Sequence, residues 1–181
     1  TDVNVLVSVV ADPTQVDEGG TSDITVTPTT GTAPFTLDFS FSINGQNNQV
    51  QRTGCDPANA GTCTETLTFA NNNNDGQPVA VAVQVTDSGN NVAAAAVNID
   101  VQNVAPTIAV NPTTITGTEG TQETITVTCT DVDGTTASFV SGTASTVSQA
   151  AADTFNWTPE FGDVRDDGVL VFRCTDDEGA T

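Results

Sequence analysis

The stretch "PFTLDFSFSI", residues 34–43, decides the fold because apolar and polar side chains alternate along its length. The residues between the apolar ones are Thr, Asp and Ser, whose polar side chains favour contact with water. A period of two is typical of a β-strand with one buried and one solvated face. This stretch therefore predicts a strand of an antiparallel sheet. Its core-facing residues are Phe35, Leu37, Phe39, Phe41 and Ile43.

The same alternation recurs on both sides of this stretch. It is found in "VNVLVSVV" (residues 3–10), "PVAVAVQV" (78–85) and "VAAAAVNIDV" (92–101). The last two are separated by the turn-forming residues "TDSGNN", which predicts a β-hairpin. No stretch has convincing helical periodicity, and "TVSQAAADTF" (146–155) is expected to hold a short helical turn at most. The sequence therefore predicts an all-β protein.

The second half of the chain repeats the first. "DPTQVDEGGTSDITVT" (12–27) matches "NPTTITGTEGTQETITVT" (111–128), and "VQVTDSG" (83–89) matches "VFRCTDDEG" (171–179). A repeat of this length is one small β-domain of about seven short strands. We therefore expect two tandem Ig-like antiparallel β-sandwiches, residues 1–103 and 104–181. The boundary falls in "DVQNVAP" (100–106), where Pro106 cannot donate a ladder hydrogen bond.

Composition excludes several classes of function. The 181 residues include 23 acids and only 3 Lys or Arg, all of them Arg, for a net charge of -20, and there is no His. Without His or Lys there is no Ser-His-Asp triad, no Schiff base and no P-loop, so we expect no enzyme; a hydrolase that uses carboxylates alone is the alternative left open. Three Arg cannot form the basic footprint that nucleic acid requires. The chain has no apolar run of the length that membrane insertion requires.

Four Cys without metal-binding spacing suggest an oxidising compartment and two disulfides. Three pairings are open, and four free buried thiols are the alternative. We favour Cys55–Cys63 and Cys129–Cys174, because Cys129 and Cys174 are in phase with the apolar residues of "ITVTC" and "LVFRC". Their sulfurs should then meet between two sheets. Trp157, the only Trp, is expected in the core near that second bridge.

Several short motifs resemble those of a known class of repeats. "NVAPTI" (103–108), "TDVDG" (130–134), "FNWTP" (155–159) and "CTDDEGA" (174–180) are similar to the polycystic-kidney-disease-type and cadherin-like repeats of bacterial and archaeal cell-surface proteins. The resemblance implies an Ig-like fold at an extracellular or cell-surface location. It implies a stalk, spacer, adhesive or assembly module, whose partners are neighbouring repeats, copies of itself, a cell-surface protein or a glycan.

The cadherin-like resemblance also implies calcium at the junction of the two domains. Calcium takes six to eight oxygen ligands, and "DVDG" carries two carboxylates around one bend. The linker departs from the cadherin pattern at Gln102, Asn103 and Val104. Asn103 is nevertheless one of the candidate ligands. The alternative is that Asp, Asn and Gly only form turns and cap backbone groups. The candidate ligands are Asp100, Asn103, Asp131, Asp133 and Asp176, with Glu18 and Glu119 as weaker ones.

The second repeat lacks the strand that follows the acidic turn of the first. After "TDSGNN" the first repeat continues with "VAAAAVNIDV", whereas the second reaches Thr181. A sandwich without that strand has an unpaired edge and an open groove. Either the sequence is cut from a longer polypeptide, or "VNVLVSVVADP" (3–13) of a neighbour fills the groove. That segment is also needed as the first strand of its own domain.

The function expected from the sequence is a non-enzymatic stalk or spacer of a cell-surface protein. The first alternative is a subunit of an extracellular filament or surface layer assembled by β-strand addition. The weaker alternative is a glycan-binding accessory module, which the low aromatic content of 5% disfavours.

Overall fold

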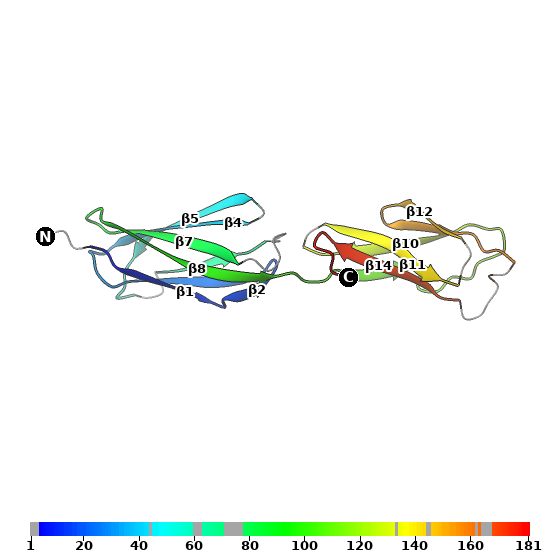
Figure 1. The fold of residues 1–181 in the computed structure, drawn as a ribbon, viewed down its shortest axis with the longest axis horizontal. Coiled ribbons are helices and arrows are strands. Elements are labelled where there is room, and N and C mark those ends of the chain that lie inside the picture. Colours follow the sequence, from blue (N-terminus) through cyan, green and yellow to red (C-terminus); the bar gives the residue numbers. More distant parts are fainter. Residues whose placement is uncertain are drawn as a thin grey trace. The chain divides into compact units, whose positions relative to one another are not determined.

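The computed structural model describes residues 4–43, 45–59, 63–70, 78–132, 134–143, 146–161, 163 and 168–181. The described residues form β-strands joined by turns, without an α-helix (Figure 1). The predicted all-β, Ig-like architecture is confirmed. None of these residues belongs to a helix that is long and apolar enough to cross a membrane. The chain folds into two compact units, Thr1–Asn103 (unit 1) and Val104–Thr181 (unit 2).

Unit 1 is a sandwich of a five-stranded and a three-stranded sheet. The larger sheet has the order β2 (Gln15–Asp17), β8 (Val92–Gln102), β7 (Val79–Thr86), β4 (Phe35–Ile43) and β5 (Gln46–Cys55). The smaller sheet has the order β1 (Val7–Asp12), β3 (Thr21–Pro28) and β6 (Thr64–Thr68). Neighbouring strands are antiparallel, except that β2 runs parallel to β8.

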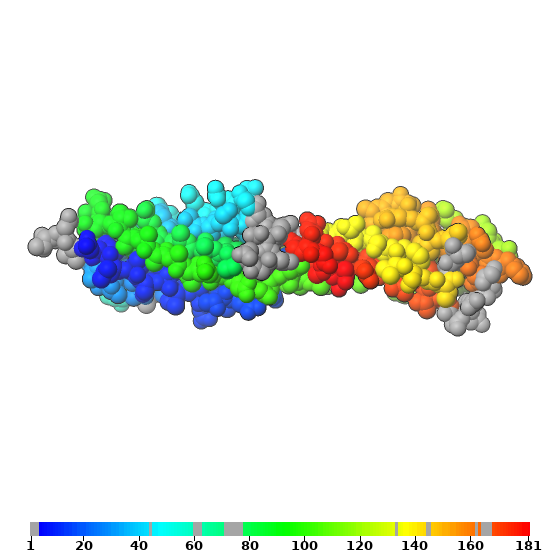
Figure 2. Space-filling view, in the orientation of Figure 1, coloured from blue at the N-terminus to red at the C-terminus, as the bar shows by residue number. Residues whose placement is uncertain are grey.

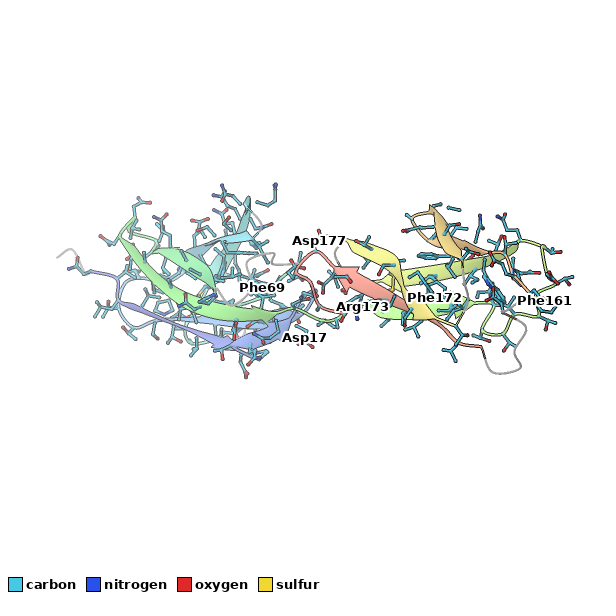
Figure 3. All side chains as sticks on the ribbon, turned by 45° about the vertical axis from the view of Figure 1, so that its right-hand side comes forward. Asp17, Phe69, Phe161, Phe172, Arg173 and Asp177 are labelled. Atoms are coloured by element: carbon cyan, nitrogen blue, oxygen red, sulfur yellow. A yellow bond between two sulfur atoms is a disulfide. The ribbon has the colours of Figure 1, made fainter. Side chains whose placement is uncertain are left out.

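The core of unit 1 follows the alternation read from the sequence. In β4 the five predicted residues are buried, and the residues between them are half-buried or exposed. Phe69 lies in the interior with them (Figure 3). The outer side chains of β7 and β8 are small or polar for the most part and include Ala80, Ala82, Ala94 and Ala96, in the green region of Figure 2. The opposite faces of these two strands are apolar and complete the core.

Unit 2 is a smaller sandwich. Its four-stranded sheet has the order β12 (Val147–Ala151), β13 (Thr154–Trp157), β10 (Glu123–Thr130) and β9 (Thr107–Asn111). The facing sheet consists of β11 (Thr135–Gly142) and β14 (Leu170–Asp176). The two sheets meet through aromatic rings, with the centroids of Phe155 and Phe172 5.0 Å apart.

The structure contains both of the disulfides that the sequence favoured. Cys55–Cys63 closes a short loop after β5, with its Cα atoms 4.8 Å apart. Cys129–Cys174 joins β10 to β14, with its Cα atoms 5.6 Å apart. Because β10 and β14 belong to different sheets, the second bridge fastens the two layers of unit 2 to each other.

"TVSQAAADTF", for which the sequence allowed a short helical turn at most, contains no helix: β12 and β13 form an antiparallel hairpin, with an irregularity between Gln149 and Ala151. Alanine has the highest intrinsic helix propensity, but such propensities are small, and the pairing of β12 with β13 outweighs them here. One expectation from the sequence was wrong, because Trp157 does not lie beside the second bridge. It pairs with Glu123, whereas Cys129 lies six residues further along β10, about 20 Å away at the rise of an extended strand.

Candidate functional site

The two units differ most at the strand that precedes the acidic turn. In unit 1 this strand is β7, which has β4 on one side and β8 on the other. In unit 2 the matching strand is β14, which the repeat "VQVTDSG"/"VFRCTDDEG" aligns with β7. Among the strands that the structure describes, β14 is hydrogen-bonded to β11 alone. One edge of β14 therefore offers backbone N–H and C=O groups without a partner strand.

The side chains beside this open edge are less buried than their counterparts in unit 1. Val81 and Val83 of β7 are 0% exposed, whereas the aligned Leu170 and Phe172 are only half-buried. A similar difference in burial appears beside β8. In unit 1, Val16 of β2 is buried and pairs in parallel with Val101 of β8. Its counterpart Ile115 is half-buried in a segment without strand structure.

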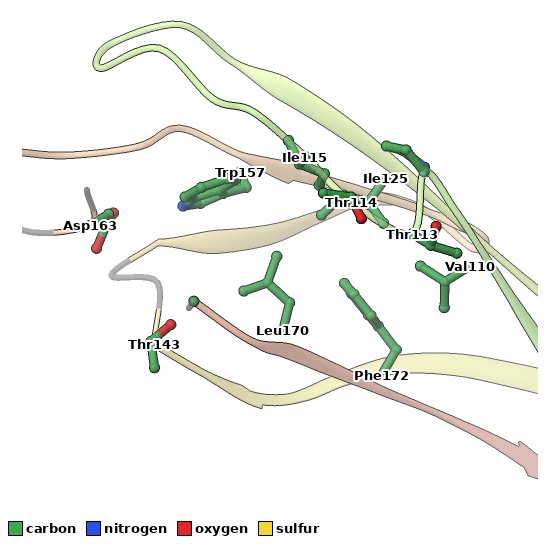
Figure 4. A pocket seen from close by; sticks show the side chains of 12 residues that line it. Val110, Thr113, Thr114, Ile115, Ile125, Thr143, Trp157, Asp163, Leu170 and Phe172 are labelled. Carbon is green, nitrogen blue, oxygen red and sulfur yellow. The ribbon is translucent and has the colours of Figure 1, made fainter. Parts of the chain in front are cut away.

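A cavity of about 270 Å³ opens between the two sheets of unit 2. Leu170 and Phe172 line it from β14, and Ile125 and Trp157 from the facing sheet (Figure 4). The Trp157 indole Nε1 is buried there and donates no hydrogen bond to any residue that the structure describes. Other lining residues are Val110, Pro112, Thr113, Thr114, Ile115, Thr143, Asp163 and Gly168.

A second cavity of about 250 Å³ lies further along the same strand. Pro106 and Ile108 line it beside β9, and Val171 to Cys174 line it from β14. Arg173 is exposed in this place, and it forms no ion pair with the residues that the structure describes (Figure 3). Since both cavities follow β14, we call the two together the β14 groove, lined by Ile108, Ile115, Trp157, Leu170, Phe172 and Arg173.

The candidate calcium ligands of unit 1 lie near the end of β8. Asp100 is half-buried in β8, opposite Gln15 of β2. Glu18 is buried, and its backbone N–H donates to the carbonyl of Gln102, with 3.0 Å between N and O. Asn103 follows that residue directly. The fold therefore brings Glu18 and Asn103 to the same end of unit 1.

The candidate calcium ligands of unit 2 do not all lie at the same end of the unit. Asp131 follows β10; its Oδ1 accepts from the N–H of Val132 at 2.7 Å, and its buried Oδ2 accepts no hydrogen bond from the residues that the structure describes. Asp176 is buried at the end of β14, opposite Thr135. Glu119 is exposed in the turn before β10, and so lies at the other end of that strand. Asp133 lies outside the described residues.

Within the part of the chain that the structure describes, no group of three or more His, Cys, Asp or Glu side chains is placed to hold a metal ion. The calcium site stays a prediction.

Sequence reasoning missed the role of Asp87. Its carboxylate accepts backbone N–H bonds from Asn91 at 2.8 Å, Thr32 at 3.1 Å and Gly89 at 2.8 Å. These bonds, led by that of Asn91, lower the pKa of Asp87 against the opposing effect of burial. Asp176 holds the aligned turn in unit 2, where its Oδ1 accepts the N–H of Ala180 at 2.7 Å. The signal was available, because Asp precedes the turn Gly in both repeats.

Comparisons with known proteins found likeness only at the level of the fold. No protein-family description matches the chain, and no curated protein sequence matches it. The Yersinia pseudotuberculosis adhesin InvE is similar over 98% of this chain and 58% of its own length, with 16% identity and a TM-score of 0.45. Murine CEACAM1b is similar over 93% of this chain and 90% of its own, with 20% identity and a TM-score of 0.32.

A superoxide reductase (neelaredoxin) from Ignicoccus hospitalis is similar over 53% of this chain and 79% of its own, with 13% identity and a TM-score of 0.39. Since all three TM-scores lie below 0.5, these likenesses carry no argument about what the chain does.

Proposed function

We propose that this chain is a non-enzymatic structural and adhesive module of the cell exterior, serving as a stalk or spacer of a cell-surface protein. The observation that carries the proposal is the Cys129–Cys174 bridge between the two sheets of unit 2. Disulfides persist in oxidising compartments, and small extracellular domains use them where the hydrophobic core is small. The core of unit 2 is of that kind, with five buried apolar side chains among the described residues.

Charge and chemistry support the same conclusion. A net charge of -20 keeps a surface module soluble and apart from other acidic molecules. The chain has neither His nor Lys, the residues that most often supply general bases and amine nucleophiles. Two buried acids, Asp87 and Asp176, accept backbone N–H bonds that hold turns.

Surface labelling tests the proposal. Antibodies against residues 1–181 should label intact cells that make the protein, and permeabilisation should add little signal. In protein released from those cells, residues 1–181 should contain no thiol that reacts with a maleimide before reduction, and all four of their Cys should react after it. Labelling that appears only in permeabilised cells, together with reactive thiols before reduction, would contradict the proposal.

The filament alternative is less favoured by the structure of unit 1. Its donor would be the segment that contains β1, and β1 is paired with β3 along all of Val7–Asp12. Donation to a neighbour would break that ladder and expose Val5 and Ala11, which are buried in unit 1. Electron microscopy of the purified chain tests this alternative, because a filament subunit should assemble without another protein.

A further inference from the structure

We propose that the outer edge of β5 in unit 1 pairs with the same edge of a second copy of the chain, antiparallel and about a two-fold axis at Gln49. This inference goes beyond the proposed function and does not rest on it. Among the strands that the structure describes, β5 is hydrogen-bonded to β4 alone, and Figure 1 shows it at the rim of unit 1. The chain continues from β5 on both sides, into β4 and into the Cys55–Cys63 loop, so this edge does not depend on either terminus.

The backbone of β5 is only half used. In an antiparallel ladder, alternate residues direct their N–H and C=O groups to opposite sides of the strand. Pairing with β4 extends from Gln46 to Cys55 and uses the groups on one side. In the described part of the chain, no backbone hydrogen bond outside the ladders involves residues 46–54. The groups on the other side therefore form a template for another strand.

The side chains of β5 do not protect this edge. Edge strands are commonly blunted by short length, by charged side chains or by Pro. The other edge strands of unit 1 that the structure describes, β1, β2 and β6, are shorter and contain Asp12, Asp17 and Glu65, respectively. β5 has ten residues and no acid. Its one charged residue, Arg52, is held by Glu65, with 2.8 Å between Nη1 and Oε2.

The first six residues of β5, "QNNQVQ" (46–51), are complementary to a copy of themselves. Short uncharged segments without Pro or Gly form strands that pair with identical segments, and Asn and Gln amides add hydrogen bonds between the copies. About a two-fold axis at Gln49, this residue lies opposite itself and Asn47 lies opposite Gln51, so that amides meet amides. The same register keeps the two Arg52 side chains apart.

Charge restricts where two copies can meet. Chains with a net charge of -20 repel each other, so close contact is favoured where acids are absent. β5 meets that condition, and the acid beside it on β4, Asp38, accepts a hydrogen bond from Gln51 Nε2 at 2.6 Å. A ladder of a few residues buries less than the roughly 1,200 Å² of a stable interface, so the dimer should be weak. It should become tighter as salt screens the remaining repulsion.

Sedimentation equilibrium of the 181-residue chain tests the inference. The apparent mass should rise towards that of a dimer between about 10 µM and about 500 µM, the range of a weak interface. It should not exceed that mass, because a two-fold contact is closed. The rise should begin at lower protein concentration in about 0.5 M NaCl than in about 0.05 M NaCl.

Matched variants localise the contact. Gln49→Glu should weaken association at least about 5-fold, because two carboxylates then face each other across the axis. Gln122→Glu gives the same net charge at an exposed side chain of unit 2 and should leave association unchanged relative to the parent. Circular dichroism checks that the variants are folded.

A mixture of variants checks the register. Gln49→Arg alone should also associate at least about 5-fold more weakly than the parent, since two guanidinium groups then face each other. Mixed with Gln49→Glu, it should associate at least as tightly as the parent, because opposite charges meet at the axis.

Two results would overturn the inference. One is an apparent mass that stays at that of the monomer at both salt concentrations, with the chain folded. The other is self-association that Gln49→Glu weakens no more than Gln122→Glu does, which would place the contact away from β5. Neither result bears on surface labelling, so failure here is separable from failure of the proposed function.

Discussion

At the scale of single residues, Asp87 is the group whose ionisation is most closely tied to the fold of unit 1. Its carboxylate holds the turn between β7 and β8 through three backbone N–H groups. Because these bonds lower the pKa of Asp87 in the folded state, the charged form contributes stability above the pKa of the unfolded chain. That contribution is lost as the pH falls through the folded pKa.

We therefore predict that acidification from about pH 7 to about pH 3 destabilises unit 1 less in Asp87→Asn than in the parent chain. The variant should already be less stable at neutral pH, because an amide is a weaker acceptor for three N–H donors. Urea unfolding at both pH values, followed by circular dichroism, measures the difference. Asp38→Asn is the control, since Asp38 accepts one side-chain bond, from Gln51. Equal pH dependence in Asp87→Asn and the parent would contradict this role.

Asp131 carries the calcium prediction at the residue scale. Its Oδ2 is buried and accepts no hydrogen bond within the described part of the chain, which is costly for a carboxylate unless a cation or a donor is close. We predict that about 1 mM Ca²⁺, a concentration typical for extracellular modules, raises the unfolding midpoint of unit 2. Asp131→Asn should reduce that rise, and Asp153→Asn, an exposed acid in another turn, should not. Identical midpoints in calcium and in chelator would end the calcium hypothesis.

At the scale of elements, the two disulfides should differ in what they contribute. Cys129–Cys174 spans 45 residues and joins two sheets, whereas Cys55–Cys63 spans 8. In the chain-entropy description, a longer closed loop restricts the unfolded chain more, which gives about 4 kcal/mol for the long bridge and about 2.5 kcal/mol for the short one. We predict that Cys129→Ala/Cys174→Ala lowers the free energy of unfolding more than Cys55→Ala/Cys63→Ala does. Urea unfolding of the two double variants gives both losses, and the reverse order would refute the prediction.

Strands with strict alternation could be predicted from the sequence, and the others could not. β4, β7 and β8 alternate because one face meets a core and the other meets water. β5 is mostly polar and was not predicted, because it is a sheet-edge strand held mainly by its pairing with β4. β12 is similar, since its pairing with β13 leaves most of its side chains exposed.

The candidate site was predictable only in outline. The repeat indicated that β14 corresponds to β7, but not which side chains line the cavity beside β14. A core position is expected for Trp157 because a large aromatic side chain buries much apolar surface. Its place beside Leu170 in a cavity depends on the pairing of β13 with β10, which no local pattern of the sequence specifies.

At the scale of the whole molecule, each unit has its own core, and the two cores differ in size. Among the described residues, twenty buried apolar side chains form the core of unit 1 and five form that of unit 2. Because burial of apolar surface is the main favourable term in folding, unit 2 should be the less stable of the two. We predict that urea unfolds unit 2 first.

Trp157 makes this prediction testable, because the only Trp of the chain belongs to unit 2. Fluorescence should follow a single transition at low urea, whereas circular dichroism should follow that transition and a second one at higher urea. Reduction of the disulfides should move the fluorescence transition further than the second one, since the longer bridge lies in unit 2. Coincident transitions by both probes would instead mean that the chain unfolds as one cooperative body. The core of unit 2 would then depend on unit 1 for its stability.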